Sequence, residues 1–195
     1  MINLFLQIFF IVVNLIKSTI RWQHLDGNIK SKSQLFIRAW FKNRIAFLAK
    51  LGMLGLPLVY IFTPWLNFAD YTLPLVLNIG GCILYALGLI VFYRAHHDLG
   101  SNWSPKILKG QAKELITHGI YEKVRHPMYS SLWVLAISHP FILTNWVAGF
   151  SGLLAFAYFY FSRVEKEEDL LVKQFGKSYW LYMQDTGRII PKLGR

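Results

Sequence analysis

The amino-acid sequence predicts an all-α integral membrane protein with five membrane-spanning helices, built as a single domain over residues 1–195. Apolar residues make up 54% of the chain, more than the roughly 45–50% of an ordinary soluble domain. They gather in four blocks, each at least about as long as the ~20 residues that a helix needs to cross a bilayer. Lys and Arg are absent from 51–93 and 126–162, which is the charge pattern of membrane helices and their short outer links.

The first three apolar blocks, 2–20, 45–66 and 72–93, are each predicted to form one membrane-spanning helix. A cleaved signal peptide is not expected at the start, because the first block has no basic residues before it and no A-x-A-like cleavage site after it. The basic and aromatic segment 21–44 follows. We expect it to lie as a connection on the cytoplasmic leaflet, with a lid over a site as the alternative.

The fourth block, 130–162, is predicted to form a helical hairpin. Pro140 and the polar pair Thr144–Asn145 interrupt it, so two shorter helices joined by a tight turn are expected. Pro127 fits the first turn of the first helix, because proline has no N–H group and pre-sets a helical φ angle. The second helix is expected to continue into the cytoplasm as an amphipathic C-terminal helix. Its apolar residues at helical spacing are Leu170, Leu171, Phe175, Tyr179 and Tyr182.

The polar stretch 94–123 comes before the hairpin and is predicted to be a cytoplasmic loop. Within it, residues 113–116 indicate a short element that is stopped at Gly119. All 21 Lys and Arg residues lie in 17–50, 94–125 and 163–195. By the positive-inside rule these stretches are cytoplasmic, which places the N-terminus outside and the C-terminus in the cytoplasm.

The net charge of +11 is explained by this orientation and by anionic lipid head groups, so nucleic acid is not a predicted partner. A metal site is not predicted either. The single Cys82 lies in a membrane segment, and the six histidines are scattered without the paired helical spacing of membrane di-iron enzymes. The adjacent His96 and His97 are therefore expected to be structural.

Candidate functional residues gather at both ends of the hairpin. The helix start at Pro127 offers free N–H groups and a positive dipole end to an anion such as a carboxylate. Arg163 lies one turn before Glu167 on the same helix face, and Glu168 follows. From spacing alone these charges also fit an interfacial ion pair beside a solvated acidic patch.

The combined pattern G-x-Y-x-x-x-R-H-P-x-Y, an aromatic helical hairpin and R-x-x-x-E-E-x-x-L-x-x-x-F-G-x-x-Y-x-x-Y closely resembles the isoprenylcysteine carboxyl methyltransferase family. The resemblance is strong over 94–191, and the layout is similar to that of the compact prokaryotic members. In this chain the pattern is carried by Gly119, Tyr121, Arg125, His126, Pro127, Tyr129, Arg163, Glu167, Glu168, Leu171, Phe175, Gly176, Tyr179 and Tyr182.

The resemblance implies an S-adenosyl-L-methionine-dependent methyltransferase that releases S-adenosyl-L-homocysteine and methylates the carboxylate of a lipidated, isoprenylcysteine-like substrate. It implies catalytic roles for Arg163 and Glu167, with Arg163 binding the substrate carboxylate. The expected partners are a lipid or prenylated small substrate and membrane lipids, with no obligate protein partner. The cofactor contacts that the resemblance implies are Lys113, Glu114, Leu115, Ile116, Tyr121, His126, Pro127, Met128, Tyr129 and Glu167.

Three other functions stay open from the sequence. A phospholipid or lipid-amine N-methyltransferase needs a base to deprotonate the amine, for which His126 or Glu168 are candidates. An NADPH-dependent enzyme similar to the sterol reductases is a second alternative, because the C-terminal half of those reductases is distantly similar to that of this chain. A non-enzymatic membrane scaffold or transporter is disfavoured, because the buried charges and repeated halves of transporters are missing from the sequence.

Overall fold

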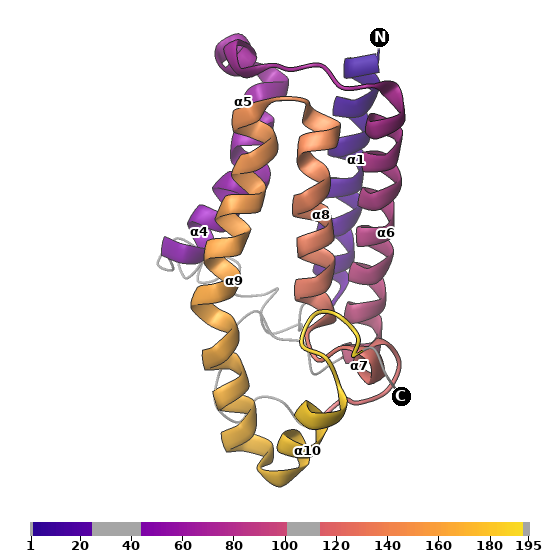
Figure 1. Ribbon diagram of the computed structural model, residues 1–195, viewed down its shortest axis with the longest axis vertical. Helices are drawn as coiled ribbons and strands as arrows, with labels where there is room; N and C mark the ends of the chain where they lie inside the picture. The colour runs from indigo at the N-terminus through magenta and orange to yellow at the C-terminus, as the bar shows by residue number, and fades with distance from the viewer. Residues whose placement is uncertain (1, 25–43, 101–113, 193–195) are drawn as a thin grey trace.

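The computed structural model describes residues 2–24, 44–100 and 114–192, and these ranges fold into helices joined by turns. The long helices run along the long axis of the molecule, and shorter helices lie at both ends (Figure 1). The elements are α1 (Ile2–Gln23), α4 (Arg44–Lys50), η1 (Leu51–Gly55), α5 (Leu56–Phe62), η2 (Pro64–Ala69), α6 (Leu75–Leu99), α7 (Ile120–Lys123), α8 (Pro127–Leu143), α9 (Trp146–Phe175) and α10 (Lys177–Asp185).

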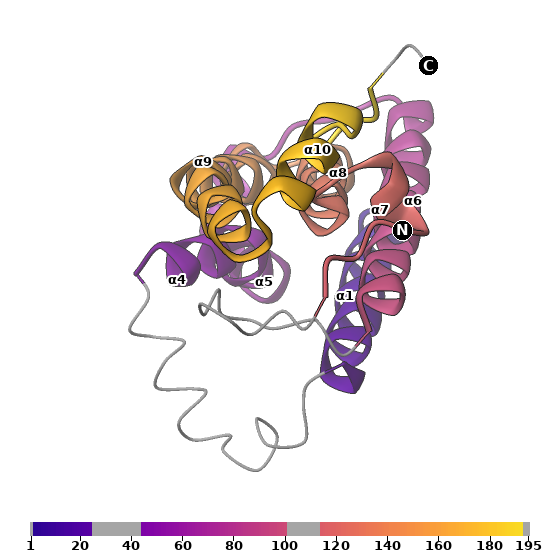
Figure 2. The ribbon, with the colours of Figure 1, turned by 90° about the horizontal axis from the view of Figure 1, so that it is seen from below.

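Helix α8 is the centre of the bundle. It packs between α6 on one side and α9 on the other, α1 covers α6 and α8, and α4, η1 and α5 pack along α9 (Figure 2). Several α8 side chains are fully buried in these interfaces, including Leu135 and His139. The central helix is therefore fixed by neighbours from both halves of the chain, and its first turn has a defined place at the polar end of the bundle.

The second apolar block, predicted as one helix over 45–66, forms a continuous helical span over Arg44–Phe62 that contains a π-helical turn. A π-helical turn, η1, separates α4 from α5, and the helix ends at Phe62 before the short 3-10 helix η2. Close packing accompanies the π turn. The Ser151 hydroxyl of α9 donates to the Gly52 carbonyl at 2.9 Å, and a Cβ on Gly52 would lie 2.4 Å from the Ala155 Cβ.

The predicted helical hairpin is confirmed, although its break lies at one of the two expected places. Helix α8 runs through Pro140 and ends at Thr144, which has a left-handed φ of 47°. The Asn145 side chain caps α9 by accepting from the Val147 and Ala148 N–H groups. Its amide also donates to the Asp70 carboxylate at 2.7 Å, which ties the hairpin turn to the link before α6.

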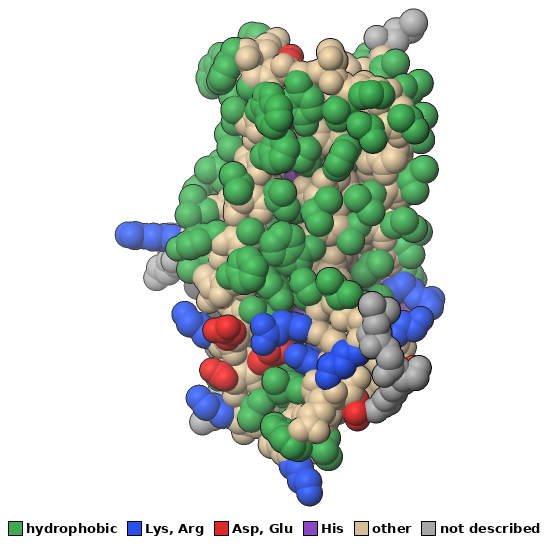
Figure 3. Space-filling model, viewed as in Figure 1, with side chains coloured by type: hydrophobic (Ala, Val, Ile, Leu, Met, Phe, Trp, Pro, Cys, Tyr) green, Lys and Arg blue, Asp and Glu red, His purple; other side chains and the backbone are tan. Residues whose placement is uncertain are grey.

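The apolar surface confirms an integral membrane protein, whereas the predicted number of five spans is not confirmed. Among the described residues, four helices are long and apolar enough to cross a membrane: Ile2–Gln23, Arg44–Phe62, Leu75–Leu99 and Trp146–Phe175. Helix α8 has 17 residues, the lower end of the spanning range of about 17–25, so a fifth span is not confirmed. On the face that Figure 3 shows, hydrophobic side chains cover most of the bundle and a band of charged side chains lies toward the α10 end.

Two local predictions at the polar end were wrong. Residues 114–118 form no helix; instead α7 begins after Gly119, whose φ of 62° suits glycine, and the Asp98 carboxylate accepts from the Ile120 N–H at 2.8 Å. The C-terminal helix is also not continuous, because Gly176, with a φ of 57°, separates α9 from α10. The predicted segment 21–44 lies mostly outside the described residues.

Candidate functional site

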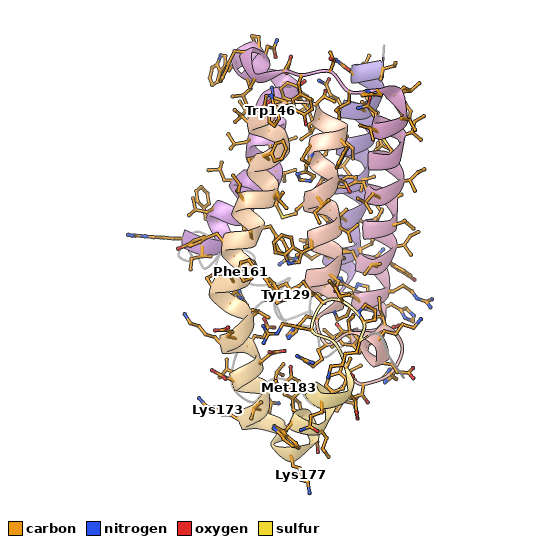
Figure 4. The ribbon with its side chains drawn as sticks, in the orientation of Figure 1. Tyr129, Trp146, Phe161, Lys173, Lys177 and Met183 are labelled. Carbon is orange, nitrogen blue, oxygen red and sulfur yellow. The ribbon has the colours of Figure 1, made fainter. Side chains whose placement is uncertain are left out.

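The site forms where the first turn of α8 meets the polar extension of α9. The Tyr129 hydroxyl donates to Glu167 Oε2 at 2.5 Å, so residues 38 positions apart in the chain are directly bonded. Figure 4 shows Tyr129 lying between the two helices. A hydrogen bond from a phenol to an ionised carboxylate is shorter and stronger than one between neutral groups.

Aromatic side chains form the membrane side of this site. The Tyr129 ring lies 5.5 Å from the Tyr160 ring and 6.3 Å from the Phe159 ring, both in edge-to-face geometry. The Arg163 guanidinium lies 5.2 Å from the Phe159 ring centroid, within cation–π range. Arg163 Nε is buried without a hydrogen-bond partner among the described residues, so a buried donor remains available for an anion.

Glu168 is the centre of an ion-pair cluster on the adjacent face of α9. Its side chain is almost fully buried, and its Oε1 accepts from Arg125 Nε at 3.0 Å and from Arg125 Nη2 at 2.9 Å. Its Oε2 accepts from Arg188 at 2.5 Å, and His126 Nε2 lies 3.3 Å from Oε1. We call Arg125, His126, Glu168 and Arg188 the Glu168 cluster.

The Glu168 cluster binds the C-terminal tail, residues 186–190, to which Arg188 belongs. Arg125 Nη1 donates to the Met183 carbonyl at 3.0 Å and to the Thr186 carbonyl. Burial lowers the pKa of Arg188, but the hydrogen bond and the charge of Glu168 outweigh it and raise that pKa above its usual value. The tail therefore carries a permanent positive charge to the cluster.

Backbone pairing fixes the same tail beside the start of α8. The Arg125 N–H donates to the Gly187 carbonyl at 2.8 Å, and the His126 N–H donates to the Arg188 carbonyl at 2.9 Å. The Ser130 hydroxyl, one turn into α8, donates to the Ile189 carbonyl at 2.7 Å. The tail therefore forms one wall of the site.

The structure brings part of the predicted cofactor-binding set together. His126, Pro127 and Tyr129 are buried around the α8 start, Met128 beside them is half-buried, and Glu167 reaches this group from α9. Ile116 is buried, Leu115 is half-buried, Glu114 is exposed and Lys113 lies outside the described residues.

Tyr121 has a clear packing role in the structure. Its hydroxyl donates to the Ala95 carbonyl of α6 at 3.2 Å, and the Tyr182 hydroxyl donates to the Tyr121 carbonyl at 2.5 Å. Burial raises the pKa of both tyrosines, so both hydroxyls remain protonated donors. Tyr121 therefore joins α7 to α6 and α10, and its contact with a cofactor stays a prediction.

The described residues fit a donor that carries a carboxylate, an amino group and hydroxyls. His126 precedes α8 without capping it through its side chain. Pro127 has no N–H group and the Ser130 N–H donates to the His126 carbonyl, so the Met128 and Tyr129 N–H groups of the first turn remain available to an anion. Glu167 supplies a carboxylate acceptor beside them. Among the described residues, no group of three or more His, Cys, Asp or Glu side chains forms a metal site.

Sequence reasoning missed the Glu168 cluster. Glu168 was expected in a solvated patch or as a base, and Arg188 was given no role, yet the buried Glu168 carboxylate forms an ion pair with the half-exposed Arg188. Arg125 and Glu168 both belong to the motif strings, which was the available signal. The position of Arg188 beside them depends on the fold of the tail.

The fold and the site define an all-helical integral membrane protein with a cluster of polar side chains at one end of its bundle, where α8 begins. Residues 81–173 match the isoprenylcysteine carboxyl methyltransferase (ICMT) family, and the resemblance predicted from the motifs is thereby confirmed over this part of the chain.

Curated proteins similar to this chain carry the name of the same enzyme family. The chain is 34% identical over 113 residues to a protein-S-isoprenylcysteine O-methyltransferase from Dictyostelium discoideum, covering 57% of this chain and 48% of that protein. It is 30% identical over 117 residues to the Homo sapiens enzyme of the same name, covering 59% of this chain and 41% of that protein. The matches thus span less than half the length of these relatives.

A solved structure of the eukaryotic intramembrane Ras methyltransferase ICMT shares the fold. The TM-score is 0.55 at 28% sequence identity, and the match covers 75% of this chain and 50% of that chain. The likeness extends beyond the motif-bearing half of the molecule.

Proposed function

We propose that this protein transfers a methyl group from S-adenosyl-L-methionine to the carboxylate of a lipidated, isoprenylcysteine-like acceptor at the cytoplasmic surface of a membrane. Residues 1–195 act as one domain in this proposal, with the N-terminus outside and the C-terminus in the cytoplasm. The proposal rests on the family match and on the site that the motif residues build.

The contact between Tyr129 and Glu167 is the observation that carries the proposal. It joins the two motif strings, which are separated by the whole hairpin, and leaves Arg163 one helical turn away on the same face as Glu167. A chance resemblance of the strings gives no reason for their functional residues to converge.

The donor-binding groups are the first turn of α8 and Glu167. The N–H groups at the helix start suit the donor's carboxylate, and Glu167 suits its amino group or ribose hydroxyls. When bound, S-adenosyl-L-methionine supplies an electrophilic methyl group on a sulfonium. The aromatic wall at Tyr129 and Phe159 excludes water and favours a cation nearby.

Arg163 is the group proposed to orient the acceptor. Its planar guanidinium matches a carboxylate, and its buried Nε remains available for that bond. A bond to one carboxylate oxygen leaves the other free to attack. A carboxylate is already ionised at neutral pH, so the residues of the site have only to align the reactants and exclude water.

The Glu168 cluster favours a carboxylate acceptor over a lipid amine. An amine must lose a proton first, and Glu168 was a candidate base. In the structure this carboxylate is bound by Arg125 and Arg188, and neighbouring positive charges disfavour its protonation. Glu168 is therefore unsuited to act as the base that an amine acceptor needs.

A competition assay with radiolabelled methyl donor tests the proposal in detergent-purified protein. A farnesylated cysteine analogue is expected to be methylated, whereas phosphatidylethanolamine is not, and the rate is expected to be flat with pH above neutrality. Methylation of the amine alone, or a log-linear rise with pH, would contradict the proposed acceptor.

Arg163→Ala tests the role of the acceptor-binding group. We expect methyl transfer to fall by about 100-fold or more, because alignment of the reactants is lost. Binding of S-adenosylhomocysteine, measured by calorimetry, is expected to stay within about twofold. Equal loss of both would show that Arg163 belongs to the donor site.

A further inference from the structure

Glu168 lies at the junction of three chain segments. It is 4% exposed and belongs to α9, and its partners come from the residues before α8 and from the C-terminal tail. Removing a carboxylate from water is costly unless its partners are well placed, so the cluster holds these segments in one arrangement.

We propose that Glu168 is a positioning residue for the methyl-donor site. By binding Arg125 and Arg188 it fixes Glu167 against Tyr129 and keeps the tail beside the start of α8, and thereby sets the affinity for the donor. This inference rests on the proposed methyltransferase function and goes beyond it, because Glu168 itself has no contact with a reactant in the proposal.

Glu167 and Glu168 are neighbours on α9 and bind different partners. Neighbouring residues on an α-helix point about 100° apart, so Glu167 and Glu168 project from adjacent faces. Glu167 meets Tyr129, while Glu168 meets Arg125. Two bonds on adjacent faces of the polar extension of α9 therefore hold Glu167 toward Tyr129 more firmly than the Tyr129 bond alone.

Glu168 also holds the C-terminal tail in position. Arg188 binds through both its side chain and its backbone. Its guanidinium donates to Glu168, and its backbone carbonyl accepts from the His126 N–H. His126 directly precedes the first turn of α8, which is the proposed anion-binding start. The Arg188–Glu168 ion pair therefore restrains the tail at the edge of the donor site.

The contacts of Glu168 leave it no direct chemical role in methyl transfer. Both Glu168 oxygens are occupied by guanidinium groups at 2.5–3.0 Å. A carboxylate held in this way is neither a base nor an open acceptor for a ligand. The contribution of Glu168 is therefore to geometry, and its loss should act on donor binding more than on the chemical step.

The experiment compares Glu168→Gln with the wild type. We expect the Kd for S-adenosylhomocysteine and the donor KM to rise about tenfold, with kcat at saturating donor changed less than about twofold. Arg188→Ala should show the same direction of change, and Arg188→Lys should recover most of the affinity. Glu165→Gln, at an exposed position of the same helix, is the matched control and should leave both constants unchanged.

The outcomes separate this inference from the proposed function. If the wild type binds no S-adenosylhomocysteine, the proposed function fails. If the wild type binds it but Glu168→Gln and Arg188→Ala bind it equally well, or lose kcat with Kd unchanged, the positioning role is overturned. Should Glu168→Gln not fold, Arg188→Ala decides alone, because it leaves the Arg125–Glu168 pair in place.

Discussion

At the scale of single residues, Tyr129 joins the apolar and polar sides of the site. Its ring packs edge-to-face on Tyr160, while its hydroxyl donates to Glu167. A phenol can do both because its body is apolar and its tip is polar. Replacing the ring and removing the hydroxyl are therefore separable changes.

Tyr129→Phe removes the hydroxyl and keeps the ring. A hydrogen bond to a charged group contributes about 1.5–3 kcal/mol, so we expect donor affinity to fall about tenfold or more as Glu167 loses its orientation. Calorimetry with S-adenosylhomocysteine measures this. Tyr158→Phe is the control, since Tyr158 is exposed on the outer surface of α9, and unchanged affinity in Tyr129→Phe would contradict the role.

The motif strings predicted part of the set of residues that converge, but not every bond between them. Tyr129 and Glu167 were both predicted for the cofactor site and are bonded to each other. The partners of Glu168 were not predicted, because Arg188 reaches it only after the chain turns at Gly176 and again at the tail. Contacts between distant segments depend on such turns, which leave weak signals in a sequence.

At the scale of elements, the α6–α8 interface depends on close backbone approach. A Cβ added to Gly81 would lie 2.4 Å from the Phe141 Cβ, whereas a Cβ on Gly80 would meet nothing within 4 Å. These adjacent glycines thus differ in packing although both lie within α6.

Gly81→Ala is expected to destabilise the protein by about 1–3 kcal/mol, the usual cost of overpacking. Gly80→Ala should be neutral or stabilise it by up to about 1 kcal/mol, because alanine favours the helix. Thermal unfolding in detergent compares the two. Equal melting temperatures would show that α6 and α8 pack less closely than described.

Helix positions were predictable from apolar length, while irregularities within and between helices were predictable only in part. The hairpin turn at Thr144–Asn145 followed from its polar pair, and the structure adds the Asn145 bonds to Asp70 and Val147. The π turn at η1 gave no comparable signal, because its glycines alone do not distinguish a π turn from close packing.

At the scale of the whole molecule, the charged band lies at one end of an apolar bundle (Figure 3). The orientation with this end in the cytoplasm stays a prediction from the positive-inside rule. Cysteines introduced singly into a Cys82→Ser background test it in intact cells: Asn67→Cys should react with an impermeant thiol reagent, and Lys173→Cys should react only after permeabilisation. The reverse labelling pattern would show that the protein has the opposite orientation in the membrane.

Helix α9 is an unbroken rod of 30 residues, about 45 Å long at 1.5 Å per residue. It is anchored by Asn145 at one end and carries Arg163, Glu167 and Glu168 toward the other. Any tilt that a thinner or thicker bilayer imposes on this rod is transmitted to the reactive end, since no hinge within α9 absorbs it. Turnover should therefore vary with the acyl-chain length of the surrounding lipids.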